Sequence, residues 1–358
     1  MGWNLPNVTN KKSLETTSDE VSSSDHGEAG TSLGLEIGLR LLRTGPAFIL
    51  LALVVVMAIL NEYFLTIRNL QNLCTQTAMV AALALGQLLV IVVRGVDVSV
   101  GSVLGLTVVI SGLMMDAGYT NGLMHVVVFI AVGALFGAFN GFMIVKGGIP
   151  LPLIVTVATL GIGRGMALLL SGGSEHIGMT PVVEFAGNGS IYGIPVPAIL
   201  VGILTILLAV FTLKTLWGRW IYAVGGNPDI ANWLGVPRDR VVMSAYIICG
   251  AMAGFAGILY AGRTDAASPL AGAGMELDSV TAVIIGGASL FGGRGNIVNA
   301  LIGALIIGVI RNGLNLMSVS PFWEAIAIGA SILFALELDV LRRYLEEKLR
   351  ARVARSLR

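Results

Sequence analysis

The chain has 358 residues, of which 55% are hydrophobic and only 12% are charged, and its formal net charge is +1. An ordinary soluble domain carries roughly 25% charged residues, and a soluble core cannot bury so much apolar surface. A net charge this close to zero gives no support for nucleic-acid binding. The composition therefore excludes an ordinary soluble domain and predicts a protein whose helices lie in a membrane.

Glycine and cysteine usage fits close helix packing. The chain has 47 glycines, and small residues let the backbones of neighbouring membrane helices approach one another. Its two cysteines, Cys74 and Cys249, both lie in apolar stretches. They are interpreted as small buried side chains, so that neither a disulfide nor a metal site is expected.

The chain begins with a polar segment, residues 1–40, which is rich in Ser, Thr, Asp and Glu. It lacks a basic start followed by an apolar core, so it does not have the pattern of a cleaved signal peptide. Its low hydrophobicity predicts a disordered cytoplasmic tail. A membrane domain is expected over residues 41–338.

About ten apolar stretches follow, each near the length of roughly 20 residues that a helix needs to cross the bilayer. They lie near residues 45–61, 75–93, 98–115, 124–145, 150–170, 196–213, 241–260, 277–291, 297–316 and 322–338. Several are short or interrupted by glycine. The sequence therefore predicts an all-α, polytopic transmembrane helix bundle of about ten spans, some of them broken or re-entrant helices.

The basic residues fall unequally on the two sides that such spans define. With the N-terminal tail placed in the cytoplasm, only Arg68, Arg263 and Arg311 lie on the outer side. The inner side holds the run from Arg342 to Arg358 and a further set: Arg40, Arg43, Arg94, Lys146, Lys214, Arg219, Arg238, Arg240 and Arg294. Cytoplasmic loops carry an excess of Lys and Arg, so both termini are predicted to be cytoplasmic.

The segment Arg94–Ser102 places charged and polar residues between two apolar stretches. Irregular polar backbone at membrane depth is tolerated only where it lines a cavity or is covered by protein. One interpretation is a broken helix in which Asp97 caps the next helix and Ser99 or Ser102 meets a polar solute. The alternative is structural: Asp97 pairs with Arg94 and contacts no solute.

Further polar residues within the predicted spans are candidates for the same path. Arg164 lies in an apolar stretch, and an arginine at that depth is a functional candidate by default, although it could reach an interface from a tilted helix. Asn140, Asn312 and Asn315 offer neutral hydrogen-bonding groups to a polar solute. Interhelical hydrogen bonding explains these asparagines equally well.

A weak internal repeat adds Asp278 to these candidates. Residues 278–280 precede one apolar run as residues 97–100 precede another, and each run is followed by a glycine-containing stretch that ends in Asn-Gly. Many transporters consist of two such halves with the binding path between them. Chance similarity in a glycine-rich chain is the alternative.

The loop of residues 214–240 contains the signals of a short cytoplasmic helix. Asn227 suits the N-cap, Pro228 the first helical position and Gly235 the end. The helix carries three large apolar side chains on one face: Ile230, Trp233 and Leu234. Such an exposed apolar surface suits the groove of a partner protein. The alternative is that Trp233 rests at the membrane interface as an aromatic anchor.

The last segment, residues 339–358, is expected to form a basic amphipathic helix on the cytoplasmic membrane surface. Leucines at 341, 345 and 349 share one helical face, and basic residues occupy the others. A solvated helix or a frayed end is the alternative. On the outer side, the longest loop, residues 171–195, could receive a carrier protein or act as a lid.

Enzymatic signatures are absent from the sequence. It contains no Gly-x4-Gly-Lys-Ser/Thr loop for a nucleotide, no His-Glu-x-x-His and no Gly-x-Ser-x-Gly, and its three histidines are scattered. Ion-driven carriers retain carboxylates or histidines in their spans as relays. The predicted spans of this chain are almost free of such groups, and Asp97 and Glu324 are the main candidates. These features favour a non-enzymatic permease that another subunit drives.

Four segments, taken in order, resemble the ribose/xylose-type permeases of bacterial ABC importers, within the branched-chain amino acid/ribose permease superfamily. They are Gly-Val-Asp-Val-Ser-Val-Gly-Ser at 95–102, Ala-Val-Gly-Gly-Asn-Pro-Asp-Ile-Ala at 223–231, the run at 276–287, and Gly-Gly-Arg-Gly at 292–295 with Asn-Gly-Leu-Asn-Leu at 312–316. The similarity extends from about Pro46 to Leu338.

The resemblance implies a permease subunit of the inner membrane that pairs with a second permease chain. It also implies a periplasmic binding protein that delivers a monosaccharide or related neutral polyol, and a cytoplasmic ATP-binding subunit that binds the ATP. Under this resemblance the loop at 214–240 docks on that subunit, through Gly225, Gly226, Asn227, Ile230, Ala231, Trp233, Leu234 and Gly235. Few fixed charges along the spans favour a neutral polyol over a charged amino acid. A self-sufficient secondary transporter or channel is the alternative from another class.

Overall fold

The structure is a computed structural model that describes residues 45–149 and 151–320, and beyond them residues 322–323, 326–331, 333–334, 336–337, 340–341 and 344. Residues Gly45–Asp339 form one compact unit, and the description below concerns that unit. The predicted N-terminal tail at 1–40 lies outside the described residues, as do Glu324 and nearly all of the segment 339–358.

Helices dominate the described part of the chain, and four two-residue strands form two small antiparallel pairs, β1 with β4 and β2 with β3. The strands are β1 (His176–Ile177), β2 (Ser190–Ile191), β3 (Ile194–Pro195) and β4 (Ala266–Ala267). The first helix spans Gly45–Leu60. It is followed by α2 (Ile67–Val92), α3 (Val100–Asp116), α4 (Gly122–Lys146), α5 (Pro152–Ser171), α6 (Pro181–Asn188), α7 (Val196–Lys214), α8 (Leu216–Gly226), α9 (Pro228–Trp233), α10 (Arg238–Thr264), α11 (Met275–Ile285) and α12 (Ile297–Leu316).

Six of these helices are long and apolar enough to cross a membrane: α2, α4, α5, α7, α10 and α12. The helical, polytopic fold is therefore as predicted, but the expected number of about ten spans is not confirmed. At 1.5 Å per residue, the 11-residue α11 measures about 16 Å, roughly half of the hydrocarbon thickness. The apolar run at 277–291 thus continues beyond the helix, which stops at Ile285, into loop.

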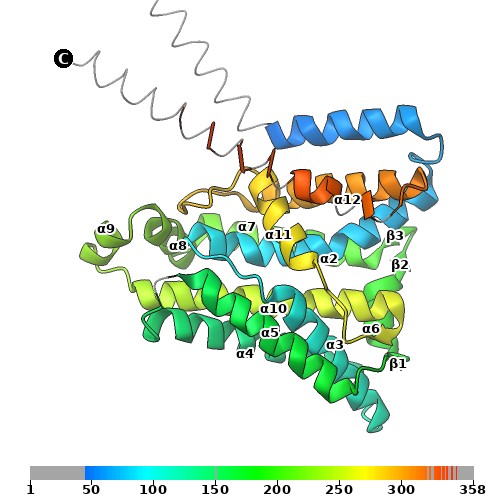
Figure 1. The fold of residues 1–358 in the computed structure, drawn as a ribbon, viewed down its shortest axis with the longest axis horizontal. Helices are drawn as coiled ribbons and strands as arrows, with labels where there is room; N and C mark the ends of the chain where they lie inside the picture. Colours follow the sequence, from blue (N-terminus) through cyan, green and yellow to red (C-terminus); the bar gives the residue numbers. More distant parts are fainter. Residues whose placement is uncertain are drawn as a thin grey trace, which may run out of the picture. The chain divides into compact units, whose positions relative to one another are not determined.

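Helix α2 occupies the centre of the compact unit, and Figure 1 shows it running among α7, α10 and α12. An unbroken buried run extends along it from Thr77 to Val92. By contrast, most residues in the apolar windows of α4, α5 and α7 are not buried, although these helices are at least as apolar as α2. Apolar composition alone therefore does not select the central helix.

Glycines let α4 and α10 pack backbone to backbone. A Cβ atom added to Gly133 would meet the carbonyl oxygen of Gly250, and one added to Gly250 would meet that of Gly133. Gly137 and Gly254 make similar contacts one turn along each helix. The high glycine content thus serves close approach of helices, as the composition predicts.

We expect Gly133→Val to destabilise the bundle, because the added side chain must push α4 away from α10. Overpacking of this kind costs about 1–3 kcal/mol, and the melting temperature of the detergent-solubilised protein should fall by several degrees. The control is Gly202→Val on α7, where nothing lies within 4 Å of the added Cβ. Equal melting temperatures for the two variants would contradict the packing argument.

Candidate coupling surface and solute path

The short helix predicted in the loop at 214–240 is present as α9. The side chain of Asn227 accepts hydrogen bonds at 3.1 Å from the backbone N–H groups of Asp229 and Ile230, and Pro228 occupies the first helical position. Gly235 ends the helix with a φ of +79°, in the left-handed region that glycine adopts without strain. The predicted cap, start and stop are all confirmed.

Helix α9 presents the predicted apolar face to the outside. Trp233 is 83% exposed, Leu234 78% and Ile230 49%. Ala231, on the opposite face, is buried and holds the helix against the bundle. Figure 1 shows α9 at one end of the bundle, opposite the end that carries β1, β2 and α6. Three large apolar side chains so exposed on a two-turn helix form a surface suited to a partner.

Arg94 connects α9 to the break between α2 and α3. Its Nε and Nη2 atoms donate hydrogen bonds of 2.7 Å to the carbonyl oxygens of Gly225 and Gly226, the last residues of α8 before α9 begins. These are carbonyls that a helix end leaves without intrahelical partners. The alternative pairing of Arg94 with Asp97 is therefore wrong, since the guanidinium turns toward the end of α8.

Gly225 and Gly226 lie at this junction, where three chain segments meet. The backbone N–H of Gly293 donates to the carbonyl oxygen of Val92 at 2.8 Å. A Cβ on Gly225 would meet that same oxygen. Gly225 is thus required for the close approach of the end of α2 and the loop that follows α11, whereas a Cβ on Gly226 would meet nothing within 4 Å.

Asp97 sits in a fully buried polar cluster. Its Oδ1 atom accepts from the backbone N–H of Ser99 at 2.9 Å and from the Ser99 hydroxyl at 2.6 Å. Asn140 of α4 donates to Asp97 Oδ2 at 3.4 Å and to Ser99 Oγ at 2.9 Å. Gln87 of α2, in the amide orientation that satisfies both of its polar atoms, bonds the backbone N and O of Asp97.

The cluster brings together three residues predicted for the solute path, but none of them reaches an opening in this conformation. Asp97, Ser99 and Asn140 are each at most 1% exposed. The N-cap of α3 is Ser99 rather than the predicted Asp97, whose carboxylate instead holds Ser99 in place. Ser102, also buried, donates to the carbonyl oxygen of Ser99 at 2.8 Å.

The other predicted path residues lie elsewhere in the bundle. Asp278, at the start of α11, forms an ion pair with Arg311 of α12 at 2.9 Å. Asn312 exchanges two hydrogen bonds with Asn69, of 2.9 and 2.8 Å. Asn315 is exposed near the end of α12. The structure therefore distributes the predicted path residues over several places instead of one site.

Arg164 of α5 is held by backbone carbonyl oxygens. Its Nη1 atom donates to Pro269 at 2.6 Å and to Ala271 at 2.9 Å, and Nη2 donates to Gly101 at 3.5 Å. The first two acceptors belong to the loop between α10 and α11, and Gly101 lies in the first turn of α3. The guanidinium thus joins α5 to both breaks in the helical chain.

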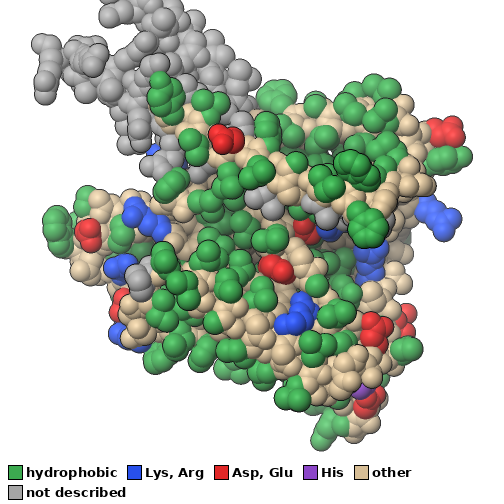
Figure 2. All heavy atoms as spheres, viewed as in Figure 1, with side chains coloured by type: hydrophobic (Ala, Val, Ile, Leu, Met, Phe, Trp, Pro, Cys, Tyr) green, Lys and Arg blue, Asp and Glu red, His purple; other side chains and the backbone are tan. Residues whose placement is uncertain are grey.

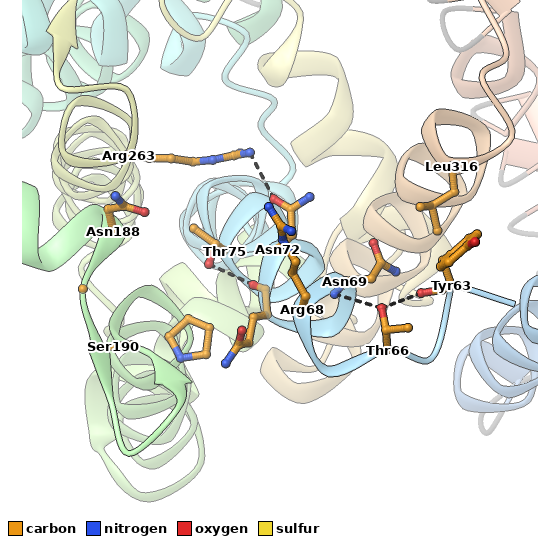
Figure 3. A pocket seen from close by; sticks show the side chains of 13 residues that line it. Tyr63, Thr66, Arg68, Asn69, Asn72, Thr75, Asn188, Ser190, Arg263 and Leu316 are labelled. Carbon is orange, nitrogen blue, oxygen red and sulfur yellow. Dashed lines mark hydrogen bonds between the residues drawn. The ribbon is translucent and has the colours of Figure 1, made fainter. Parts of the chain in front are cut away.

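A polar pocket of ≈ 710 Å³, absent from the sequence-based predictions, opens at the end of the bundle opposite α9. Figure 3 shows side chains from α2, from the end of α6 and from the end of α10, with Arg263 reaching toward Asn72. Of the described residues that line it, two are arginines and none is acidic: Tyr63, Thr66, Arg68, Asn69, Gln71, Asn72, Thr75, Asn188, Gly189, Ser190, Pro195, Arg263 and Leu316. In the sequence, the dense run of Arg, Asn, Gln and Thr at 66–75 was the feature that could have indicated this pocket.

These features define a polytopic membrane permease: apolar helices, broken helices with buried polar groups, and an exposed apolar helix at one end. The family described as "Branched-chain amino acid transport system / permease component" matches residues 69–336. The chain belongs to this family, and with its six membrane-competent helices it is a multi-pass transport subunit of the inner membrane.

Named relatives cover most of the chain. It is 39% identical over 299 residues to the ribose import permease protein RbsC of Bacillus subtilis, which covers 83% of this chain and 92% of the relative. It is 37% identical over 299 residues to the D-allose transport system permease protein AlsC of Escherichia coli, covering 83% and 91%. It is 33% identical over 352 residues to the fructose import permease protein FrcC of Rhizobium meliloti, covering 93% and 95%. No solved structure matches the chain.

Proposed function

We propose that this chain is the transmembrane permease subunit of an ATP-driven importer for a monosaccharide or a related neutral polyol. The observation that carries the proposal is the exposed apolar face of α9, on a chain whose relatives are named as permeases for ribose, allose and fructose. A cytoplasmic ATP-binding subunit supplies the energy, and this chain carries no ATPase site of its own.

The ATP-binding subunit docks on the surface around α9. The apolar side chains Ile230, Trp233 and Leu234 enter a groove of that subunit, and Ala231 and the glycines at 225, 226 and 235 set the position of the helix. Arg94 passes the movement of α9 to the α2–α3 break through its two hydrogen bonds. Movement of one packed element against another is a common way for such proteins to change state.

We further propose about ten membrane crossings, with both termini in the cytoplasm. The positions of the basic residues support this arrangement. Lys146 and Asp239 form an ion pair at 3.3 Å that joins the end of α4 to the start of α10, and Arg68 and Arg263 line one pocket. Residues that are expected on the same side of the membrane thus lie near one another.

On the outer side, the polar pocket is the place where we expect a periplasmic binding protein to deliver the solute. Its amide and hydroxyl groups suit a polyol, and its arginines suit carboxylates on the delivering protein. A second permease chain completes the transport path. In the proposed layout residues 41–338 form the membrane domain, with a cytoplasmic tail at 1–40 and a basic helix at 339–358.

The proposal is tested by co-purifying the chain from gently solubilised membranes of its own source and identifying every protein that remains bound. We expect an ATP-binding subunit, and we expect ATP-dependent uptake of a labelled sugar when the complex and its binding protein are placed in liposomes. The competing candidate is a self-sufficient secondary transporter or channel. Recovery of the chain alone, active with an ion gradient and without ATP, would establish that competitor.

Asp97→Ala is expected to impair sugar uptake strongly. The substitution leaves the N–H and hydroxyl of Ser99 without their acceptor in a fully buried cluster, and each unsatisfied buried group costs about 1–3 kcal/mol. Uptake in membrane vesicles, corrected for the amount of inserted protein, measures the effect. Asp97→Asn keeps an oxygen acceptor and should retain more activity. Unchanged uptake by Asp97→Ala would reduce Asp97 to a dispensable structural residue.

A further inference from the structure

Two charged side chains of opposite sign, one within the apolar helix α5 and one in the first turn of α11, lie on an outward-facing side of the bundle. Arg164 of α5 and Glu276 of α11 are both partly exposed. Helix α5 is largely uncovered, and nothing lies within 4 Å of a Cβ added to Gly161 or Gly165, the positions around Arg164. Figure 2 shows basic and acidic side chains among hydrophobic ones on the face that carries α5 and α11.

The guanidinium of Arg164 is fixed and still has hydrogen atoms to donate. Its three hydrogen bonds go to the carbonyl oxygens of Pro269, Ala271 and Gly101. A guanidinium has five N–H donors, so two remain without an acceptor among the described residues. The group is therefore held rigidly by backbone and has spare donors.

The carboxylate of Glu276 is short of hydrogen bonds. Its Oε1 atom accepts one bond from the backbone N–H of Gly274, at 3.3 Å. Its Oε2 atom is buried against Gly101 and has no hydrogen-bond partner within the described part of the chain. Arg164 is near enough to interact with it electrostatically, but no ion pair within 4 Å joins the two described side chains. A carboxylate with so few hydrogen bonds is stabilised by a further hydrogen bond from a hydroxyl group, if its side chain can turn to meet that group.

Lipid cannot be the partner of this pair at low cost. An arginine or a carboxylate at the centre of a bilayer costs about 2.5–3.5 kcal/mol even on the most favourable scale. Charged groups at such depth accordingly face water-filled cavities or other protein. The face around Arg164 must be wetted or covered in the assembled protein.

We propose that Arg164 and Glu276 bind the hydroxyl groups of a neutral polyol in a water-filled path, which lies on this face and is closed by the second permease chain of the proposed function. This inference rests on the proposed function and assigns two solute contacts to it. The chemistry is complementary: a hydroxyl both accepts and donates, Arg164 only donates, and Glu276 only accepts. Because the two charges cancel, the pair does not select a solute with net charge.

A zwitterionic amino acid is the other solute class that such a pair could hold, with its carboxylate on Arg164 and its ammonium group on Glu276. The relatives named for ribose, allose and fructose favour the polyol.

The test introduces a cysteine at Gly161, which lies on the same helical face as Arg164, three residues away. The Gly161→Cys variant of the full importer, with its partners in membrane vesicles, is treated with a membrane-impermeant, charged thiol reagent. The unchanged chain gives the background from Cys74 and Cys249. The control is Leu207→Cys on α7, a position 60% exposed on an apolar helix. We expect labelling at position 161 at least tenfold faster than at position 207.

D-Ribose, D-allose and D-fructose are then added as protecting solutes, with L-leucine as the comparison. We expect at least one of the sugars to slow labelling of Gly161→Cys several-fold, and we expect Glu276→Gln or Arg164→Lys in the same chain to remove that protection. Protection by leucine alone, or protection that survives both substitutions, overturns the proposal.

Slow labelling at position 161, equal to that at position 207, overturns the water-filled path even where sugar uptake is intact. Failure of the proposed function has a different signature, because uptake would then be independent of ATP whatever the labelling rates. The two proposals can therefore fail separately.

Discussion

Replacing both Trp233 and Leu234 by aspartate is expected to abolish sugar uptake while the protein still inserts in the membrane. Both side chains are mostly exposed on α9, so the change does not disturb the core. Docking would have to bury two unpaired carboxylates, and each uncompensated buried charge costs about 3–5 kcal/mol. The ATP-binding subunit should therefore no longer co-purify. Uptake in vesicles and the recovered amount of that subunit are the measurements.

The matched control is Asn232→Asp, which adds one negative charge to the same short helix away from its apolar face. Asn232 is exposed, so this variant should bind the partner and transport sugar. Near-normal uptake by the Trp233→Asp/Leu234→Asp variant would rule out the docking role of α9. It would leave Trp233 as an aromatic anchor at the membrane interface.

Replacing Arg94 is expected to uncouple ATP hydrolysis from transport. The residue has a φ of +69°, so Arg94→Asn is the suitable change, because asparagine tolerates the left-handed region that strains most side chains. It removes both hydrogen bonds to the end of α8, each worth on the order of 1 kcal/mol. The complex should still assemble, while sugar uptake per ATP hydrolysed falls about tenfold or more.

Arg94→Lys separates the geometry of this contact from its charge. A single ammonium group matches the two neighbouring carbonyls less well than the guanidinium fork, so we expect partial coupling. The ratio of sugar taken up to ATP hydrolysed, measured in liposomes, ranks the unchanged chain above Arg94→Lys and that above Arg94→Asn. An unchanged ratio in Arg94→Asn would show that Arg94 only stabilises the end of α8.

Local patterns in the sequence predicted those parts of the fold whose physics is local. The α9 helix follows from Asn227, Pro228 and Gly235, because a cap, a preset φ and a left-handed end act within a few residues. Long apolar runs likewise predicted the helices. Their number as spans could not follow, since hydropathy does not distinguish a full crossing from a half-helix such as α11.

The sites were less predictable, because they depend on which residues meet from distant parts of the chain. Glu276 gave no signal in the sequence except its place in a family motif, yet it lies beside Arg164, more than 100 residues earlier in the chain. Arg94 and Asp97 are three residues apart and of opposite charge, which favours a pairing that the structure does not contain. The polar pocket likewise combines α2 with the ends of α10 and α12.

The sequence by itself thus determined that this is a helical membrane protein with a short exposed helix in the loop at 214–240, because composition, periodicity and capping are properties of neighbouring residues. Only the tertiary structure decided that Arg94 binds the end of α8, that Asp97 is sealed with Asn140, and that Arg164 faces outward near Glu276. In a low-dielectric interior, each polar group must find its partner wherever packing brings one. Packing of helices far apart in the chain, and not sequence spacing, selects those partners.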